Sequence, residues 1–455
     1  MREKKDTLLT NQMFKFMLAT FVANFTTVLL KYVFRRNATA FPGKVIFEIC
    51  PDYLKFAQTF CKKRIINVTG TNGKTTTSGL VAQMFSTVDK CVIHNHKGAN
   101  MLTGIATAIA NGLPVLNSAD TFVFETDEAY LTKLYDDINA DYLIVTNLFQ
   151  DQLDRYGTID ATATKIQSAI KKNPQLTVFL NADDPSLLPL EINENTKFFG
   201  FENIKFSFTN ENSQLPKEIP NCFCGKNFIY EKVFYSHIGH FNCSCGIGRK
   251  KTNYSANAII HKDFSEIIIN HKNQEMVFKV YQPNIYNAYN ALAAIAIALE
   301  NNIPKEKIQH ALNTYKPIFG RAQRKIVKGK NVYTQLIKNP TGATEALRAI
   351  SAEKENSCLF IAINDNFGDG RDVSWLWDVC FETWNDYNGE IYLSGTRALD
   401  VAVRLKYADF DMKKIHVLTS NTAKAFDYVL EKASAQTVLV LPCYTALLEL
   451  EKRLR

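Results

Sequence analysis

A glycine-rich run constrains the fold of this chain more than any other feature. It comprises Gly70, Thr71, Asn72, Gly73, Lys74, Thr75 and Thr76. An apolar run at residues 64–69 precedes it and helix-like sequence at 75–85 follows, so the expected order is strand, loop, helix. Backbone N–H groups at a glycine turn that opens a helix bind anions, and a lysine neutralises terminal phosphates. We therefore predict a nucleotide phosphate-binding loop in which Thr75 also binds Mg²⁺; a chance Gly-Lys-Thr in an ordinary turn is the alternative.

A cluster of acidic residues closes the predicted strand at residues 121–124. The cluster reads Glu125-Thr126-Asp127-Glu128. Mg²⁺ prefers hard oxygen ligands, so a carboxylate at the end of a neighbouring strand is a natural second ligand. We predict that Glu125 fills this role. The alternative is a cluster that only caps a helix with favourable charges.

Predicted strands and helices alternate along the chain. Strand-like runs lie at 64–69, 121–125, 142–146, 177–181, 358–363, 390–394, 414–419 and 437–441, and helical spacing at 129–138, 161–171 and 287–301. The alternation indicates an α/β fold with parallel sheets covered by helices. Because the strand series restarts after the turn at 316–320, we predict an N-terminal helical segment (1–55), a central domain (56–318) with an insertion at about 219–250, and a smaller Rossmann-like α/β domain (319–455).

Length and charge limit the function classes. At 455 residues, with 46% hydrophobic residues, the chain is too long for one core and should form several domains. The net charge of +8 is scattered, so we expect no nucleic acid as a partner. Mild basicity suits an anionic substrate or an acidic membrane surface.

The apolar stretch at residues 13–34 raises the question of a signal peptide or membrane anchor. Lys15, Asn24 and Lys31 interrupt it, and no small-residue cleavage site follows. We predict an amphipathic helix that packs on the protein or lies at its surface. The alternative is peripheral contact of this helix with the membrane, which would place a cytoplasmic protein at the inner face of the membrane.

Four of the ten cysteines crowd into one short window: Cys222, Cys224, Cys243 and Cys245. Two close pairs about twenty residues apart, each followed by glycine, are the usual layout of a Cys₄ zinc ribbon, and the six scattered cysteines fit a reducing compartment. The pairs are Cys-x-Cys, because Asn221 and Asn242 stand where the first cysteine of each turn is expected. We predict Zn²⁺ binding; a metal-free hairpin packed by aromatic residues and a disulfide-linked form are the alternatives.

Four motifs in order carry a family resemblance. They are the run at 70–76, Asp-Gln-Leu-Asp-Arg-Tyr at 151–156, Asn-Ala-Asp-Asp-Pro at 181–185, and Asn-Ile-Tyr-Asn-Ala-Tyr-Asn-Ala-Leu at 284–292. Together they resemble the central P-loop ATPase domain of Mur ligases. The resemblance implies that ATP, bound in part by Asn287, phosphorylates a substrate carboxylate and that an amine then displaces the phosphate. It also makes Lys165 a candidate for the carbamylated catalytic lysine, while Gln152 replaces a metal-binding histidine.

The C-terminal motifs are similar to those of the MurT family, the ligase subunits of lipid II isoglutaminyl synthases. They are Leu-Ile-Lys-Asn-Pro-Thr-Gly-Ala at 336–343, Asp-Gly-Arg-Asp-Val-Ser-Trp-Leu-Trp-Asp at 369–378, Ser-Gly-Thr-Arg-Ala at 394–398 and Tyr-Thr-Ala-Leu-Leu at 444–448. This resemblance implies amidation of D-glutamate in the stem peptide of lipid II, a GatD-like glutamine amidotransferase partner, and a zinc ribbon. No cysteine here sits in a glutaminase context, so the ammonia must come from another chain.

Two aspartates of the second domain are candidate catalytic residues. Asp369 and Asp372 lie in a glycine-containing loop after the predicted strand at 358–363, where α/β proteins place functional groups. The MurT resemblance implies that one of them completes the partner's Cys-His pair, and we favour Asp369. The alternative is a turn or helix-capping role. Trp375 and Trp377 are either partner-facing or core.

Two other functions remain open from the sequence. One is a Mur-type ligase that adds an amino acid, or an enzyme like folylpolyglutamate synthase; the different motif at 336–343 and the cysteine insertion argue against it. The other is a nucleotide-binding scaffold subunit without ligase chemistry, which Gln152 supports. Co-purification of a glutaminase and ATP turnover would separate the three.

Overall fold

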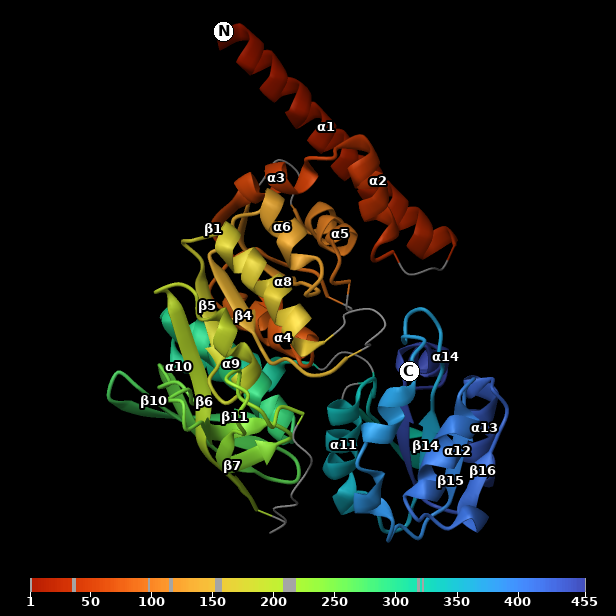
Figure 1. The fold of residues 1–455 in the computed structure, drawn as a ribbon. Coiled ribbons are helices and arrows are strands. Elements are labelled where there is room, and N and C mark those ends of the chain that lie inside the picture. Colours follow the sequence, from red (N-terminus) through yellow and green to blue (C-terminus); the bar gives the residue numbers. More distant parts are fainter. Residues whose placement is uncertain are drawn as a thin grey trace. The chain divides into compact units, whose positions relative to one another are not determined.

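The computed structural model describes residues 2–34, 38–96, 99–113, 118–151, 158–207, 218–316, 320 and 323–454. The chain forms two compact units (Figure 1). The first comprises Met1–Leu148, Ile159–Asn212 and Ile219–Tyr315, and the second Phe149–Thr158, Ser213–Glu218 and Lys316–Arg455. Both are α/β, which confirms the predicted fold class.

A nine-stranded sheet forms the centre of the first unit, in the order β11-β10-β9-β6-β5-β4-β1-β3-β2. Its strands are β1 (Cys61–Thr69), β2 (Val92–His94), β3 (Ala119–Glu125), β4 (Tyr142–Val145), β5 (Thr177–Asn181), β6 (Thr196–Phe206), β9 (Tyr254–Ile260), β10 (Ser265–His271) and β11 (Gln274–Val280). From β2 to β9 every pair is parallel, while β9, β10 and β11 form an antiparallel extension. The strands expected at 64–69, 121–125, 142–146 and 177–181 are confirmed; the antiparallel extension was not predicted.

Helices cover this sheet, as parallel strands buried on both faces require. They are α2 (Phe41–Ile49), α3 (Tyr53–Ala57), α4 (Lys74–Phe85), α5 (Leu102–Gly112), α6 (Leu131–Asp137), α8 (Ile159–Lys172), α9 (Ile285–Glu300) and α10 (Lys305–Thr314). Helix α9 is buried along most of its length, because alanine, leucine and isoleucine occupy 11 of its 16 positions.

Helix α1 (Arg2–Val28), which continues as a π-helical turn to Val33, lies along α2 (Figure 1). Its segment Asn11–Val33 is long and apolar enough to cross a membrane by length and composition, and it is the one such helix among the described residues. Only part of it is buried. Phe16, Ala19 and Ala23 pack into the core, whereas Phe21 and Phe25 are exposed.

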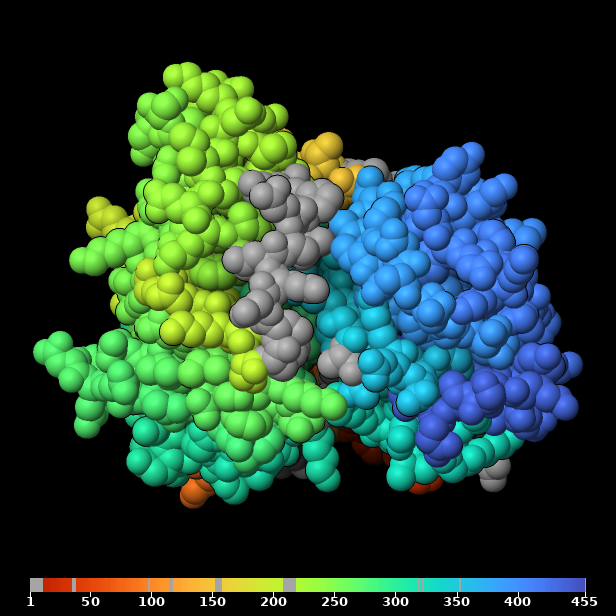
Figure 2. Space-filling model, turned by 90° about the horizontal axis from the view of Figure 1, so that it is seen from below, coloured from red at the N-terminus to blue at the C-terminus, as the bar shows by residue number. Residues whose placement is uncertain are grey.

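A small hairpin is inserted between β6 and β9. Strands β7 (Ile229–Tyr235) and β8 (Ile238–Asn242) pair antiparallel, and a cysteine-bearing turn precedes β7 and follows β8. Lime-green atoms of this part of the chain lie at the surface of the first unit (Figure 2). Phe228 and Phe241 form its small core, with ring centroids 5.1 Å apart.

The second unit contains a six-stranded sheet in the order β12-β13-β17-β14-β15-β16. The strands are β12 (Gln323–Val327), β13 (Lys330–Thr334), β14 (Ser357–Ala362), β15 (Ile391–Ser394), β16 (Ile415–Val417) and β17 (Thr437–Pro442). All pairs are parallel except β12 with β13. Helices α11 (Pro340–Ala349), α12 (Ala398–Tyr407), α13 (Thr422–Lys432) and α14 (Tyr444–Leu454) complete the unit. The loops after the parallel strands therefore meet at one edge of the sheet.

Candidate functional site

The glycine-rich run is a loop between β1 and α4, as predicted, and its two glycines are sterically required. Gly70 and Gly73 have φ values of +116° and +85°, a region that other residues rarely adopt. A Cβ atom on Gly70 would lie 2.4 Å from Thr146 Oγ1, and one on Gly73 would lie 2.0 Å from Asn290 Oδ1. The loop is therefore a close-fitting backbone turn at a helix N-terminus, the geometry that binds phosphate.

Residues after β4 hold this loop in shape. The N–H of Thr71 donates to the carbonyl oxygen of Asn147 at 2.8 Å, and the N–H of Asn72 donates to Asn147 Oδ1 at 2.9 Å. Thr146 Oγ1 donates to the Asn72 carbonyl at 2.8 Å. Sequence reasoning missed Thr146 and Asn147; their position at the carboxyl end of the strand predicted at 142–146 was the available signal.

Lys74 is buried at the start of α4. Its Nζ donates to the carbonyl of Gly70, and it also lies 3.3 Å from Thr71 O and 2.9 Å from Glu128 Oε1. Burial by itself would lower the pKa of the ammonium group, but the charges of Glu128 and Asp127 more than offset it and raise the pKa. Lys74 therefore stays charged at the start of the helix, beside the glycine loop. Glu128, its counter-ion, was in the predicted acidic cluster but had not been chosen.

The end of β3 offers oxygen ligands for a cation. Glu125 is buried, and its Oε2 has no hydrogen-bond partner among the described residues. Its other oxygen is 3.5 Å from Asn100 Nδ2, and its N–H donates to Asn95 Oδ1 at 2.8 Å. Thr75 is buried in the first turn of α4. A hydroxyl and a carboxylate are donors that Mg²⁺ accepts, and a buried carboxylate oxygen without a partner fits a bound cation.

Asn287 lies near the loop through a neighbouring asparagine on α9. Asn290 Nδ2 donates to Asn287 Oδ1 at 3.4 Å, and Asn290 is the residue that a side chain on Gly73 would strike. Both asparagines are buried. The 284–292 motif thus supports the phosphate loop from the adjacent helix.

The Asn-Ala-Asp-Asp-Pro motif joins distant segments of the first unit. Asp183 is fully buried and accepts hydrogen bonds from Arg249 Nε at 2.6 Å, Tyr289 Oη at 2.7 Å and the Phe201 N–H at 2.8 Å. Burial raises the pKa of Asp183 despite the guanidinium beside it. Asp184 accepts from the Leu148 N–H at 2.9 Å. Arg249, at the end of the cysteine insertion, was not singled out from the sequence.

Two further predicted positions remain predictions. Lys165 is half-buried on α8, and its carbonyl accepts a hydrogen bond from Thr132 Oγ1 at 3.2 Å. Gln152, the residue that replaces a histidine of Mur ligases, lies outside the described residues.

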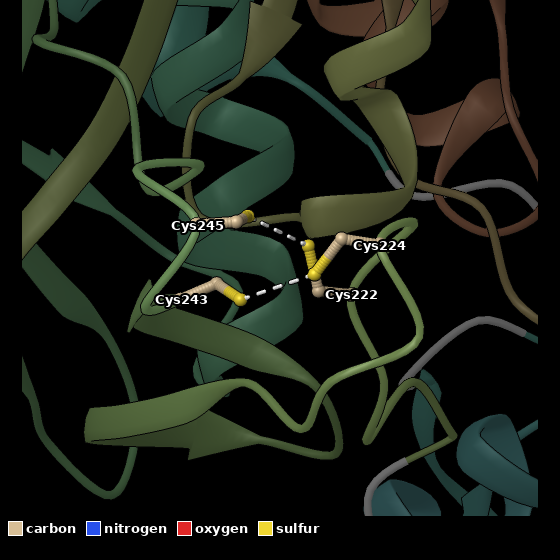
Figure 3. A group of neighbouring side chains, drawn as sticks. All are labelled: Cys222, Cys224, Cys243 and Cys245. Atoms are coloured by element: carbon tan, nitrogen blue, oxygen red, sulfur yellow. Dashed lines mark hydrogen bonds between the residues drawn. The ribbon is translucent and has the colours of Figure 1, made fainter.

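The four clustered cysteines converge on one point, as Figure 3 shows. All four sulfur atoms lie within 4.8 Å of one another, with Cys222 to Cys245 and Cys224 to Cys243 both at 3.6 Å. The backbone N–H of Cys245 hydrogen-bonds the Cys243 sulfur and lowers the pKa of Cys243 to about 7. Sulfur ligands at this spacing suit one tetrahedral metal ion.

The two cysteine turns have the same backbone geometry. The backbone N–H of Cys222 donates to the Lys226 carbonyl at 2.7 Å, and that of Cys243 donates to the Ile247 carbonyl at 2.8 Å. The backbone carbonyl of each cysteine accepts from the N–H of the glycine three residues later, at 2.9 Å in both turns. Gly225 and Gly246 have φ values of +85° and +91°. The displaced cysteines thus keep matching turns in both halves, although the Cys-x-Cys spacing is unusual.

In the second unit, Asp369 holds the N-terminus of α14. Its Oδ1 accepts from the Thr445 N–H at 2.8 Å and its Oδ2 accepts from the Thr445 hydroxyl at 2.5 Å, and the side chain is largely buried. Asp372 is partly exposed, and its Oδ1 accepts from the Ser374 N–H at 2.8 Å. Hydrogen bonds from the Ser374 side chain and backbone lower the pKa of Asp372. Asp369 thus holds a helix N-terminus and Asp372 closes a local turn, and the catalytic role of either aspartate stays a prediction.

The 336–343 motif lies after β13 and begins α11. Asn339 Oδ1 accepts from the Gly342 N–H at 2.7 Å and so caps the helix. Lys338 Nζ lies 2.5 Å from Asp151 Oδ2, and Thr341 donates to Glu218. Within the second unit, the 336–343 motif therefore places the ammonium group of Lys338 against the carboxylate of Asp151, the first residue of the 151–156 motif.

Comparison with known proteins agrees with this geometry. The family described as Mur ligase middle domain matches residues 68–298, and the family described as MurT ligase C-terminal matches residues 336–447. Lipid II isoglutaminyl synthase (glutamine-hydrolyzing) subunit MurT of Staphylococcus aureus strain COL is 32% identical over 90% of this chain and 92% of that protein. The subunit of the same name from Streptococcus pneumoniae is 33% identical over 92% of each chain.

Solved structures share the fold. A pseudomurein peptide ligase type C from Methanothermus fervidus has a TM-score of 0.69 at 20% identity and covers 90% of this chain and 84% of its own. The MurF ligase from Thermotoga maritima, solved in complex with ADP, has a TM-score of 0.59 at 14% identity and covers 91% of this chain and 84% of its own.

Proposed function

This chain belongs to the Mur ligase family and, within it, to the MurT subunits, and from that membership we propose that it amidates the α-carboxyl of D-glutamate in lipid II. The observation that carries the proposal is the joining of two features in one chain. A phosphate loop with the buried cation Lys74 lies in the first unit, and a MurT-type segment at 336–447 forms most of the second. An enzyme that adds an amino acid would need the first feature but not the second.

The loop residues would activate the carboxylate. Backbone N–H groups between Gly70 and Lys74 would bind the ATP phosphates, and the Lys74 ammonium would move from Glu128 to a phosphate oxygen. Thr75 and Glu125 would hold Mg²⁺, which neutralises charge on the phosphates when it is bound. A substrate carboxylate oxygen then attacks the γ-phosphorus and ADP leaves; ammonia attacks the acyl phosphate, and phosphate leaves as the amide forms.

We propose that the ammonia comes from a GatD-like glutamine amidotransferase subunit. The name of the S. aureus and S. pneumoniae relatives describes a glutamine-hydrolysing synthase subunit, which implies a partner. Asp369, or else Asp372, would orient the histidine of that partner's catalytic pair. The hydrogen bonds from Thr445 and Ser374 hold each carboxylate in one direction.

An apolar stripe on α12 supports a docking face for this partner. Leu399, Val403 and Tyr407 are spaced four residues apart and are all exposed, and the exposed Trp377 packs its ring 5.5 Å from that of Tyr407. Arg404 lies against Trp377, with its guanidinium carbon 5.8 Å from the ring centroid, and its Nη2 donates to the Val379 carbonyl and to Glu382 Oε1, both at 2.7 Å. Trp375 packs against the core, so the two tryptophans of the loop differ in role.

We propose that the four clustered cysteines bind one Zn²⁺ ion that is structural. Four sulfur ligands would leave no open coordination position for substrate or water. The matching turns and the small aromatic core of the insertion support a ribbon whose halves the ion would join. We also place the enzyme in the cytoplasm at the inner face of the membrane, where a lipid-linked substrate would be met.

The test is amidation of lipid II by this chain together with a GatD-like partner, followed by mass spectrometry of the product. We expect amide formation that requires ATP and Mg²⁺ and that accepts either glutamine or ammonium salts. An amino acid joined to the substrate would instead identify an adding ligase. A stable complex without ATP turnover would identify a scaffold subunit.

A further inference from the structure

Helix α1 presents apolar side chains on two opposite faces. The buried face carries Phe16, Ala19 and Ala23, and the polar Thr27 continues it. The exposed face carries Phe14, Met17, Leu18, Phe21, Phe25, Val28 and Tyr32. Each set recurs at intervals of three and four residues, the period of one helical face. A helix that serves only as a lid on the core needs the first set alone.

The buried face binds α1 firmly to the first unit. The Phe16 ring stacks on Tyr53 and Phe60 at centroid distances of 4.6 and 5.0 Å, and Thr20 Oγ1 is 3.0 Å from the Tyr53 hydroxyl. A helix that crosses a bilayer would have to give up these contacts along its middle. The packing therefore favours a helix that lies parallel to a membrane surface over one that spans it.

The charge of this segment identifies what the exposed face meets. Residues 1–36 contain seven lysines and arginines against two acidic residues, a net charge of +5 out of +8 for the whole chain. Lys15 and Lys31 are both exposed, and they lie near the two ends of the exposed apolar segment along the chain. A second copy of this face would carry the same positive charge and be repelled. An anionic lipid surface complements both the charge and the apolar stripe.

We propose that α1 is an interfacial membrane anchor, whose Phe14, Phe21 and Phe25 insert among the lipids while Lys15 and Lys31 contact anionic headgroups. This inference goes beyond the proposed ligase activity, because it concerns where the first unit is held and not what it catalyses. The anchor would restrict the search for a lipid-linked substrate to the plane of the membrane.

Vesicle flotation of the full chain tests the proposal without any catalytic readout. Vesicles of phosphatidylglycerol and phosphatidylethanolamine should carry the protein at low salt, and vesicles of phosphatidylcholine should carry far less. F21E/F25E should weaken binding by about a hundredfold, because two aromatic side chains no longer leave water. K15Q/K31Q should weaken binding to the anionic vesicles by about tenfold or more. Alkaline carbonate should release the bound protein.

The matched control is I326E/V277E, which changes two exposed apolar residues on edge strands far from α1 in sequence. It should float like the wild type. Equal flotation of F21E/F25E, or equal binding to neutral and anionic vesicles, would overturn the proposal. Binding that resists carbonate would also overturn it, because such resistance marks a spanning helix. So would a wild-type protein that does not float but forms a dimer that F21E/F25E dissociates. Unchanged ATP turnover in F21E/F25E separates loss of the anchor from loss of fold.

Discussion

Lys74 has two competing anionic partners, the buried Glu128 carboxylate and an incoming phosphate. The 2.9 Å contact with Glu128 keeps the ammonium charged before nucleotide arrives. Because Lys74 and Glu128 form a buried ion pair, a substitution of Lys74 has to be tested together with one of Glu128. Removal of one member of a buried ion pair leaves the other uncompensated, which costs about 3–5 kcal/mol.

We expect K74A to abolish ATP hydrolysis and also to lower the free energy of unfolding. K74A/E128Q should recover most of the stability but none of the hydrolysis, because the buried charge is gone while the phosphate still lacks its cation. Urea denaturation and a phosphate-release assay measure the two effects. Hydrolysis in the folded double variant would contradict the assignment of the loop.

The raised pKa of Glu345 should make the stability of the second unit depend on pH. It is buried on α11, its nearest cation is Arg348 at 3.9 Å, and burial raises its pKa from 4.5 to about 7. Because the folded pKa is the higher one, its stabilising contribution is complete below pH 4.5 and is lost as the pH rises through 7. Relative to E345Q, the free energy of unfolding of the wild type should fall by about 1.4 kcal/mol per pH unit within this window.

Denaturation of both proteins at pH 5, 6, 7 and 8 measures this difference. The free energy of unfolding of the wild type minus that of E345Q should fall up to about pH 7 and then level off. A constant difference at all four values would show that Glu345 does not titrate in this range.

At the scale of elements, the cysteine insertion consists of two similar local turns that lie about twenty residues apart in sequence and are brought together by strand pairing. Each turn forms from its own residues, but the two meet only when β7 and β8 pair. Metal binding should therefore be coupled to formation of the insertion.

We expect about one equivalent of Zn²⁺ in protein purified under reducing conditions. C224S should lose the metal and make the insertion sensitive to proteolysis while ATP binding persists, because the phosphate loop lies elsewhere in the unit. C91S, which changes a cysteine outside the cluster, should keep the metal. Metal-free wild-type protein would identify the bare hairpin instead.

The sequence predicted elements best where one local pattern decides them. The parallel strands and the glycine loop follow from apolar runs and turn residues, so β1, β3, β4 and β5 were placed within a few residues. The strands β9 to β11 were missed because the strand predictions relied on continuous apolar runs, whereas residues along these strands alternate in burial. Only β9 also pairs with a strand far along the chain, β6. Asn147 and Arg249 were missed because their partners are distant in sequence, 76 and 66 residues away.

At the scale of the whole molecule, the proposed partner subunit would dock on the apolar stripe of α12. The α12 stripe should supply affinity through burial of apolar area. We expect L399E/Y407E to abolish co-purification of the GatD-like partner while ammonia-dependent amidation continues. I326E, on the edge strand β12, serves as the control for a charge placed on an exposed apolar residue. Retained co-purification would move the docking face elsewhere.

Asp369 should act across that interface. D369N should reduce glutamine-dependent amidation by orders of magnitude but spare amidation fed with ammonium salts, because an amide cannot support an imidazolium. T445V removes the hydroxyl that bonds Asp369 and controls for the effect on α14. Equal loss in both assays would limit Asp369 to its capping role, and no loss in either would transfer the assignment to Asp372.

The hydrogen bonds at Asp183 give the cysteine insertion a meaning beyond metal binding. Arg249, the last part of the insertion, neutralises this carboxylate, and the same carboxylate holds Tyr289 on the helix whose Asn290 packs against Gly73. A continuous series of contacts thus connects the cysteine insertion, through Asp183 and α9, to the glycine loop. A related protein with a shorter insertion that lacked Arg249 would leave the buried Asp183 carboxylate without a counter-ion. Related proteins that lack the four cysteines should therefore still have a cationic side chain opposite Asp183.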